Sequence, residues 1–297
     1  MGSIEKRNLC FTKVIQNLNF ESNPFILILV PLFLLGTAIG SFYFNLAYRV
    51  LDLYYSQNRK LYKGFQRWRE LFITPSHCEN CGSKIHSIHL IPILGYAFCK
   101  GKCPNCGYQI PLIYPIGEFL FGAMAVSCFL ASGDLLLSFL VLAFTGHLLI
   151  SIYTDSVYFS LDYENLIWIL IWGSLINYTM TSELPGINEI WILVGFAGFF
   201  LLLYLFYPRG IGFGDVLFAP SFAFLSAHPW WMLFLNASYI PAVLITILIR
   251  KKYGQNIRNV PIPMGVYFCL GIFITFLFKF LYTYFNFIET QEIEIYE

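Results

Sequence analysis

The chain contains 297 residues, of which 58% are hydrophobic and only 12% are charged, and its formal net charge at pH 7 is +1. Soluble domains carry about 25% charged residues, so this composition excludes an ordinary water-soluble protein and predicts an integral membrane protein. The first residues are polar and of mixed charge, which is not the pattern of a cleavable signal peptide.

Long apolar stretches predict a series of membrane-spanning helices. A helix needs about 20 mostly apolar residues to cross a bilayer. Such stretches occupy 25–48, 111–133, 135–153, 165–182, 190–207, 216–249 and 260–288. The stretch 216–249 is too long for one span and is interrupted by His228-Pro229, so we expect two helices there. The sequence therefore predicts an all-α polytopic membrane protein with about eight transmembrane helices.

The loop between the first two predicted spans is strongly basic. Arg49–Lys102 holds nine of the 18 Lys and Arg residues against three acidic residues. Short loops rich in Lys and Arg stay on the cytoplasmic side, so we expect this loop to be cytoplasmic. Counting spans from it places Asp155 and Asp215 on the same side. Within the loop, Gln57–Leu71 has the pattern of an amphipathic helix that lies on anionic lipids.

Four of the eight cysteines form two Cys-x-x-Cys pairs in this loop. They are Cys78 with Cys81 and Cys103 with Cys106, and a glycine follows each pair. Two such turns supply the four thiolates that a structural zinc ion prefers, and a cytoplasmic loop argues against disulfides. The alternatives are a redox pair or chance spacing. Because four sulfurs leave zinc no open position, we expect the metal to shape the loop.

Two aspartates stand at the predicted cytoplasmic ends of different helices. Asp155 follows the third span, and Asp215 opens the sixth behind three glycines at 210, 212 and 214. A carboxylate at a membrane boundary is costly and indicates function, and two carboxylates at short range share one proton. Such a pair can activate water and protonate a leaving group. The alternative is that both are ordinary helix-end residues.

Glu118 and His147 are two further candidate residues inside predicted spans. Glu118 lies in the second span and is either a site residue or a polar contact between helices. His147 lies in the third span, where we expect a hydrogen-bonded packing residue.

Together these features resemble the type IV prepilin peptidase family, the bifunctional leader peptidase and N-methyltransferase of bacterial pilus and type II secretion systems. Several motifs occur in the family's order. They are Gly40-Ser41-Phe42 with Asn45 and Arg49, the two cysteine pairs with Ile91-Pro92 between them, Tyr114-Pro115 with Glu118, the glycine-aspartate run Gly210–Asp215, and Pro261–Gly265.

The resemblance implies an aspartyl endopeptidase with Asp155 and Asp215 as the catalytic pair, and with Gly210, Gly212, Gly214 and Glu118 as supporting residues. Its substrates would be prepilin-like or pseudopilin proteins, cut after a glycine that ends a short basic leader at the cytoplasmic face of the bacterial inner membrane. The new amino terminus would then be methylated from S-adenosylmethionine. Expected partners are these proteins and membrane lipids, and no nucleic acid.

Three positions depart from the family pattern. Leu217 stands where members often have Lys, His89 stands where an acidic residue usually precedes the Leu-Ile-Pro step, and Leu161-Asp162-Tyr163 replaces a common Ile-Pro-Asp or Ile-Pro-Asn. The first and third bear on substrate preference, and His89 bears on the methyltransferase activity.

The predicted organisation is an amino-terminal segment (1–24), a first transmembrane helix (25–48), a cytoplasmic zinc-binding domain that is the candidate for methyl transfer (49–110), a transmembrane aspartyl peptidase domain (111–288) and an acidic tail (289–297). Three alternatives remain: a non-enzymatic zinc-loop scaffold, a peptidase without methyltransferase activity, and a transporter. Placement of both aspartates at one face disfavours the transporter, because transporter sites lie near the midplane.

Overall fold

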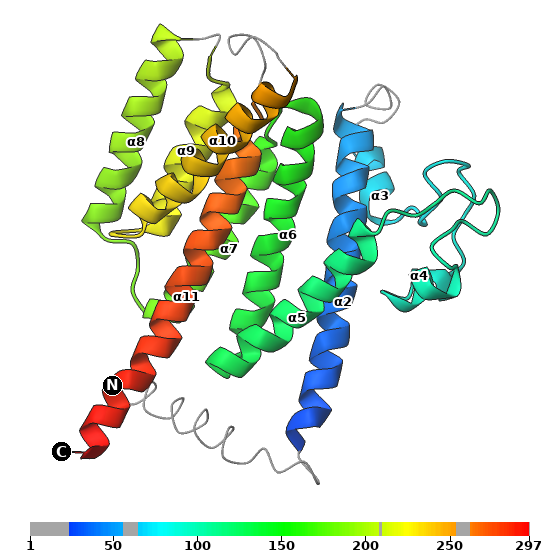
Figure 1. Cartoon of the computed structure of the whole chain (residues 1–297), viewed down its shortest axis with the longest axis horizontal. Helices are drawn as coiled ribbons and strands as arrows, with labels where there is room; N and C mark the ends of the chain where they lie inside the picture. The colour runs from blue at the N-terminus through cyan, green and yellow to red at the C-terminus, as the bar shows by residue number, and fades with distance from the viewer. Residues whose placement is uncertain (1–23, 56–64, 208–209, 254–261, 297) are drawn as a thin grey trace. The chain divides into compact units, whose positions relative to one another are not determined.

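The computed structural model of the chain describes residues 24–55, 65–207, 210–253 and 262–296 (Figure 1). The predicted amino-terminal segment, much of the amphipathic stretch, and Pro261 lie outside these residues. Within them the structure is helical, with isolated β-bridges and no strand. The helices are α2 (Pro24–Val50), α3 (Phe65–Phe72), α4 (Leu94–Phe98), α5 (Ile113–Ser132), α6 (Leu135–Tyr158), α7 (Tyr163–Thr181), α8 (Ile187–Phe206), α9 (Phe213–Ser226), α10 (Trp231–Tyr253) and α11 (Met264–Tyr296), with single turns η1 (Leu51–Tyr55) and η3 (Ser87–Leu90).

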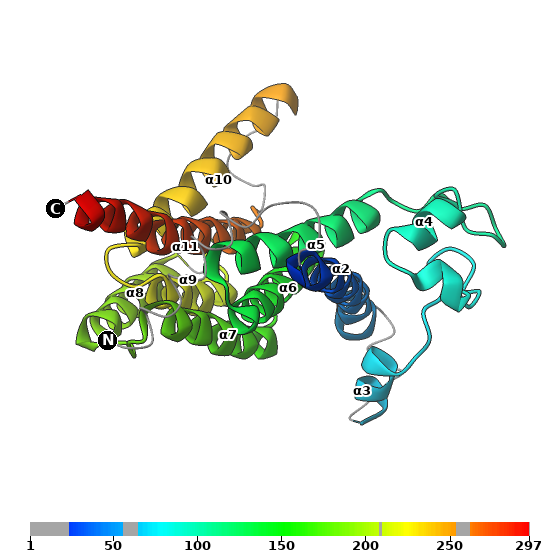
Figure 2. The same ribbon diagram turned by 90° about the horizontal axis from the view of Figure 1, so that it is seen from below.

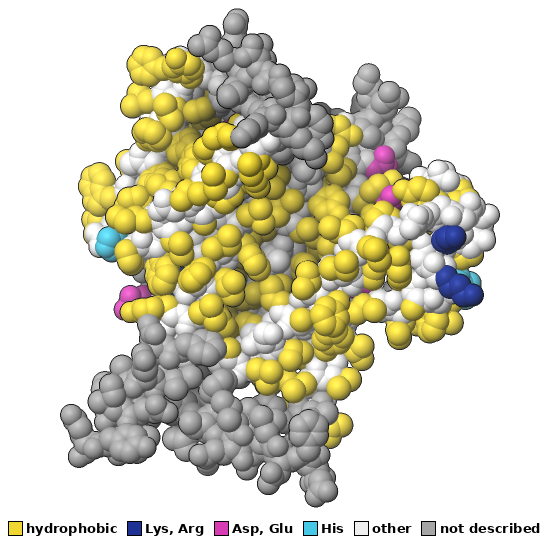
Figure 3. Space-filling model, viewed as in Figure 1, with side chains coloured by type: hydrophobic (Ala, Val, Ile, Leu, Met, Phe, Trp, Pro, Cys, Tyr) yellow, Lys and Arg dark blue, Asp and Glu magenta, His cyan; other side chains and the backbone are white. Residues whose placement is uncertain are grey.

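Six helices of the described part of the chain are long and apolar enough to cross a membrane: α2 with η1, α5, α6, α8, α10 and α11. The helices α7 and α9 complete the predicted set of about eight. α9 has 14 residues and a length of about 21 Å, which is short for a hydrocarbon core of about 30 Å. Figure 3 shows that hydrophobic side chains dominate the described part of one face. The prediction of an all-α, multi-pass membrane protein is confirmed.

Local signals in the sequence set the helix ends. Gly133 ends α5 with a left-handed φ of 67°, and the Asp134 carboxylate starts α6 by accepting the Leu136 N–H at 2.8 Å. The Asp162 carboxylate caps α7 in the same way, by accepting the Glu164 N–H at 3.1 Å.

The chain divides into two compact units, residues 1–146 and 147–297. In the first unit α2 packs along α5. Glycines permit this close approach, because a Cβ atom at Gly117 would lie 2.1 Å from the Phe44 ring and one at Gly40 would lie 2.8 Å from Phe121 Cβ. Residues 73–112 carry the two Cys-x-x-Cys pairs and lead from α3 to α5. We call this segment the cysteine loop.

In the second unit α9 is the central helix. It packs against α7, α8, α10 and α11, and the side chains of Phe218 and Phe222 are fully buried. Figure 2 shows α10 diverging from α8. Because its neighbours surround α9, this helix can lie in the membrane although it is too short for a full span.

Candidate functional site

The four predicted metal ligands lie together. The Sγ atoms of Cys78, Cys81, Cys103 and Cys106 all lie within 4.8 Å of one another. Both Cys-x-x-Cys turns have the same backbone: Gly82 donates its N–H to the Cys78 carbonyl and Gly107 donates to the Cys103 carbonyl, each at 2.9 Å. Both glycines have a left-handed φ, 67° and 71°, which residues with a Cβ adopt at a cost.

The geometry of this cluster fits a tetrahedral metal ion. Cys78 Sγ lies 3.8 Å from Cys106 Sγ, and a Zn–S distance of about 2.3 Å gives tetrahedral S···S distances of about 3.8 Å. Backbone N–H groups of Cys106 and Asn105 lower the pKa of the Cys103 thiol to about 6, which favours the thiolate at this position. The cluster can therefore hold a metal such as zinc. Cys99 is outside it, with its Sγ 2.9 Å from His89 Nδ1.

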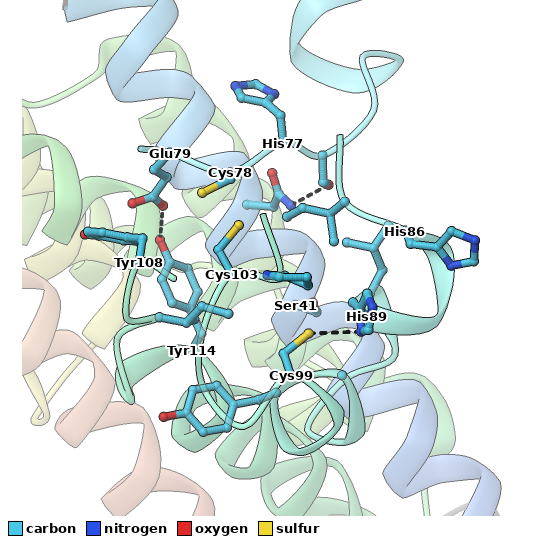
Figure 4. Close-up of a pocket in the computed structure, with 18 of the residues that line it drawn as sticks. Ser41, His77, Cys78, Glu79, His86, His89, Cys99, Cys103, Tyr108 and Tyr114 are labelled. Atoms are coloured by element: carbon cyan, nitrogen blue, oxygen red, sulfur yellow. Dashed lines mark hydrogen bonds between the residues drawn. The ribbon is translucent and has the colours of Figure 1, made fainter. Parts of the chain in front are cut away.

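A cavity of about 290 Å³ lies between the cysteine loop and the adjoining ends of α2 and α5 (Figure 4). Its lining includes aromatic side chains, two carboxylates and the His89–Cys99 pair. Members of this lining are Tyr48, Glu79, His89, Cys99, Tyr108, Tyr114 and Glu118.

Arg49 of α2 ties the start of the cysteine loop to the helix. Its guanidinium donates to the carbonyls of Leu71 at 2.9 Å and Thr74 at 2.6 Å, and to Asn45 Oδ1 at 3.1 Å. Asn45 in turn donates to Ser76 Oγ at 3.0 Å. These two residues of the first-span motif therefore position the loop two residues before its first metal ligand.

Two side chains of α5 hold the loop from the other side. Tyr114 Oη donates to Glu79 Oε1 at 2.7 Å, beside the first cysteine pair. Glu118 Oε2 accepts the N–H of Ile93 at 2.6 Å, and Ile93 has a left-handed φ of 62°. Glu118 thus restrains a strained loop residue and lines the cavity by the cysteine loop. It is not among the described residues that line the cavity of the aspartates.

Asp155 and Asp215 line one cavity of about 1820 Å³ in the second unit. Val266 near the start of α11 donates its N–H to Asp155 Oδ2, and Gly212 at the start of α9 donates to Asp215 Oδ2, each at 3.1 Å. The two carboxylates come from different helices, α6 and α9, and line the same cavity. Helix N-termini favour negative charge, so each aspartate is oriented by a backbone dipole.

Glycines allow close packing around the two aspartates. Of the three glycines predicted to support the pair, only Gly214 is tightly packed. A Cβ at Gly214 would lie 3.2 Å from Leu161 Cβ, and one at Gly265 would lie 2.5 Å from Leu161 Cδ2 and 2.9 Å from Asp155 Cγ. At Gly210 and Gly212 the nearest atom would be 3.6 Å away, an ordinary contact. Gly265, which ends the last motif of the resemblance, is not among the glycines predicted to support the pair.

His147 is a packing residue, as expected. Its Nδ1 lies 2.6 Å from Asn165 Oδ1, and Asn165 donates to Ser151 Oγ at 2.8 Å. This buried network joins α6 to α7 within the second unit. Tyr239 of α10 lines the aspartate cavity; no motif in the sequence indicated it.

Comparison with known proteins gives matches on both units. The model of the bacterial peptidase A24 N-terminal domain matches residues 34–132, and that of the type IV leader peptidase family matches residues 142–247. The prepilin leader peptidase/N-methyltransferase of Dichelobacter nodosus is 28% identical over 218 residues, covering 70% of this chain and 72% of the relative. That of Bacillus subtilis is 27% identical over 259 residues, covering 83% and 93%. No solved structure matches the chain.

The matched segments contain the features built up above: the cysteine cluster and its cavity fall in the first, and both aspartates fall in the second. The chain therefore belongs to the type IV leader peptidase family.

Proposed function

We propose that the chain is a membrane aspartyl endopeptidase that removes the leader of prepilin-like or pseudopilin proteins, with Asp155 and Asp215 as its catalytic pair. The observation that carries the proposal is the meeting of two carboxylates from different helices in one cavity, each oriented by a backbone N–H. Prepilins as substrates come from the names of the relatives, and pseudopilins come from the family resemblance of the sequence motifs.

The pair can divide the work of peptide hydrolysis. Two neighbouring carboxylates share one proton because both cannot ionise at short range. The ionised member takes a proton from water as the water oxygen attacks the scissile carbonyl carbon. The protonated member then gives its proton to the departing amide nitrogen, the C–N bond breaks, and an acid and an amine are released. The backbone donors at Gly212 and Val266 keep both carboxylates in position while the proton moves.

The basic loop supports an orientation with the aspartates at the cytoplasmic face of a bacterial inner membrane. The cut would follow a glycine that ends a short basic leader. In this orientation the substrate presents its leader on the side where the protein is synthesised, and the cut needs no translocation of the leader.

We assign methylation of the new amino terminus to the cavity by the cysteine loop. The relatives are named for this second activity, and S-adenosylmethionine would supply the methyl group as an electrophilic sulfonium. The lining carries groups of both signs. Aromatic faces and the carboxylates of Glu79 and Glu118 attract positive charge, and Arg49 and Lys84 attract negative charge. S-adenosylmethionine has both a sulfonium cation and a carboxylate, so it suits such a lining. A volume of about 290 Å³ is at the lower end of small-molecule sites. Zinc held by the four cysteines would shape this wall.

The test is cleavage of a prepilin-like substrate by the full chain in lipid vesicles, with Asp155→Asn and Asp215→Asn made separately. Each should slow leader removal by about 1,000-fold, the scale of a lost general acid or base. Asp162→Asn is the matched control, because Asn caps a helix as well as Asp does and Asp162 is not among the lining residues. The mass of the product's amino terminus reports cleavage and methylation together.

A wild-type rate in either active-site variant would contradict the catalytic pair. If both variants cut normally while loss of the cysteines abolishes assembly with partners, the chain is a zinc-loop scaffold. A product that is cut but carries no methyl group leaves a peptidase alone.

A further inference from the structure

The aspartate cavity continues as an apolar groove along α8. One face of α8 lines it through residues spaced three or four apart, from Trp191 through Gly195 and Phe199 to Leu203. Twelve residues of helix span about 18 Å. The facing wall comes from α10, through Trp231 and residues one and two turns further on. We call this the α8–α10 groove.

The groove is uncharged apart from one end. Its floor is aromatic: the rings of Phe196 and Trp231 lie 5.7 Å apart, and those of Phe200 and Phe268 lie 6.4 Å apart. Among the described residues that line the cavity, only Asp155 and Asp215 carry a formal charge. The groove is therefore uncharged and mostly apolar, with Asn236 and Tyr239 as polar side chains on its α10 wall, and it ends at two carboxylates.

The α8 wall is open rather than packed. Trp191 and Phe199 are 67% and 58% exposed, and a Cβ atom at Gly195 would meet no atom within 4 Å. The cavity volume of about 1820 Å³ exceeds that of small-molecule sites, which is about 300–1,000 Å³. A helix about 10 Å wide and 18 Å long occupies about 1,400 Å³. The space thus matches about three turns of helix.

We propose that the α8–α10 groove receives an apolar helical segment of the substrate, which follows the scissile bond on the side away from the basic leader; this inference rests on the proposed function. A charged leader is excluded from an apolar lane by its desolvation cost, so the groove takes the segment on the other side of the bond. In the predicted orientation, α8 and α10 both begin at the outer face, so the groove leads from the cytoplasmic aspartates into the bilayer.

Gly195 provides the close approach that such a helix needs. Apolar burial adds little between helices in a bilayer, because lipid tails are as apolar as the side chains, and close packing at small residues drives association instead. A large side chain at Gly195 would hold an incoming helix away from the α8 backbone and move the scissile bond from the aspartates. A lipid chain, being narrow and pliable, would still fit.

The experiment compares two substrates in the same vesicles. One is the membrane-anchored precursor, and the other is a peptide with the same leader that ends before the apolar segment. The measured quantity is the ratio of their cleavage rates. Gly195→Leu should lower this ratio at least tenfold. Gly198→Leu is the matched control, because Gly198 lies one turn away on the same helix, also has open space at its Cβ, and is not among the lining residues. Leu is a good helix former, so both variants should fold.

Equal ratios in the Gly195→Leu and Gly198→Leu proteins would overturn the proposal. A wild-type chain that cuts neither substrate marks failure of the proposed function instead. A second measurement uses a benzophenone amino acid at Phe199 in the Asp215→Asn chain, which keeps the substrate uncut. We expect crosslinks to the anchored precursor from position 199 and none from Leu201, which is exposed but not among the lining residues. Crosslinks from position 199 only to lipid, or to a second copy of the chain, would overturn the proposal.

Discussion

Within residues 24–55, 65–207, 210–253 and 262–296, the hydrogen bonds to the carboxylates of Asp155 and Asp215 come from the main chain. A hydrogen bond from a helix N-terminus fixes the position of an oxygen atom without adding a full positive charge. A lysine or arginine beside the pair would hold both groups ionised and remove the proton that the reaction needs. The main-chain donors of Val266 and Gly212 orient the two carboxylates, and under the proposed mechanism they leave the shared proton in place.

Gly265→Ala tests how closely Asp155 depends on its surroundings. The new methyl group would lie 2.9 Å from Asp155 Cγ and 2.5 Å from Leu161 Cδ2, so one of them must move. We expect the rate of leader cleavage to fall by about 100-fold, the scale of a displacement of about 1 Å at a reacting group. The measurement is kcat and KM for the anchored substrate, and we expect the loss to appear in kcat.

Gly198→Ala is the control for this substitution, because its methyl group meets open space. If the Gly265→Ala protein keeps its wild-type kcat, Leu161 yields instead and the close approach is not required for catalysis.

The two aspartates were predictable from sequence because both lie where an apolar run meets a polar one. The contact between Gly265 and Leu161 was not. It joins residues about a hundred positions apart, and it depends on the side chain of a position where the chain departs from the family pattern. Packing of this kind leaves no local signal.

Among the elements, α2 and α5 act as supports for the cysteine loop. The sequence indicated that Asn45, Arg49 and Tyr114 belong to motifs, but not what they contact. The acceptors of Arg49 are mainly backbone carbonyls, at Leu71 and Thr74. Every residue has a carbonyl, so such acceptors carry no sequence pattern, and only the fold identifies them.

Arg49→Lys tests this support. Lysine keeps the charge but lacks the planar fork that reaches several acceptors at once. We expect the segment 71–77 to exchange its amide hydrogens about tenfold faster, which corresponds to the loss of one charged hydrogen bond of about 1.5 kcal/mol. Arg69→Lys, at an exposed position of α3, is the matched control. Equal exchange in both variants would mean that the loop is held elsewhere.

Hydropathy predicts the order of the helices along the chain, but some helices end at residues other than those that hydropathy predicts. The third span was expected to stop at Tyr153, with Asp155 following it. Instead α6 runs to Tyr158, and the Phe159 N–H still bonds the Asp155 carbonyl at 3.0 Å. Hydropathy reports where a helix leaves an apolar environment, and hydrogen bonding continues beyond that point.

At the scale of the whole molecule, each compact unit contains a cavity that is lined by its own described residues. The cavity by the cysteine loop belongs to residues 1–146 and the aspartate cavity to residues 147–297. The two family models match residues 34–132 and 142–247, so they divide the chain at nearly the same place. The expected domain limit at residue 111 stays a prediction. Separate linings imply that the two proposed activities can be lost one at a time.

Removal of the metal tests this separation. Cys103→Ser, or treatment with a zinc chelator, should release the metal and loosen the cysteine loop. We expect the methylated fraction of the product to fall at least tenfold while leader cleavage stays near the wild-type rate. Mass analysis of the product and metal analysis of the protein are the measurements. Structural zinc contributes directly to the folding of its site, so the effect should concentrate in that unit.

Cys128→Ser is the control, since Cys128 lies in α5 of the same unit, outside the metal cluster and beside serine hydroxyls. Equal loss of cleavage and methylation in the Cys103→Ser protein would contradict the separation of the two activities.

The shape of the aspartate cavity also bears on inhibition. A compound that mimics the hydrated peptide bond with a hydroxyl group would engage only the two carboxylates, and a plain hydrocarbon would contact only the aromatic walls between α8 and α10. A molecule that joins a secondary alcohol to a rigid apolar tail would occupy both parts at once, and linked fragments gain affinity because the second contact is made within one molecule. The apolar tail would make such a compound partition into the bilayer, so its potency would depend on its concentration in lipid rather than in water.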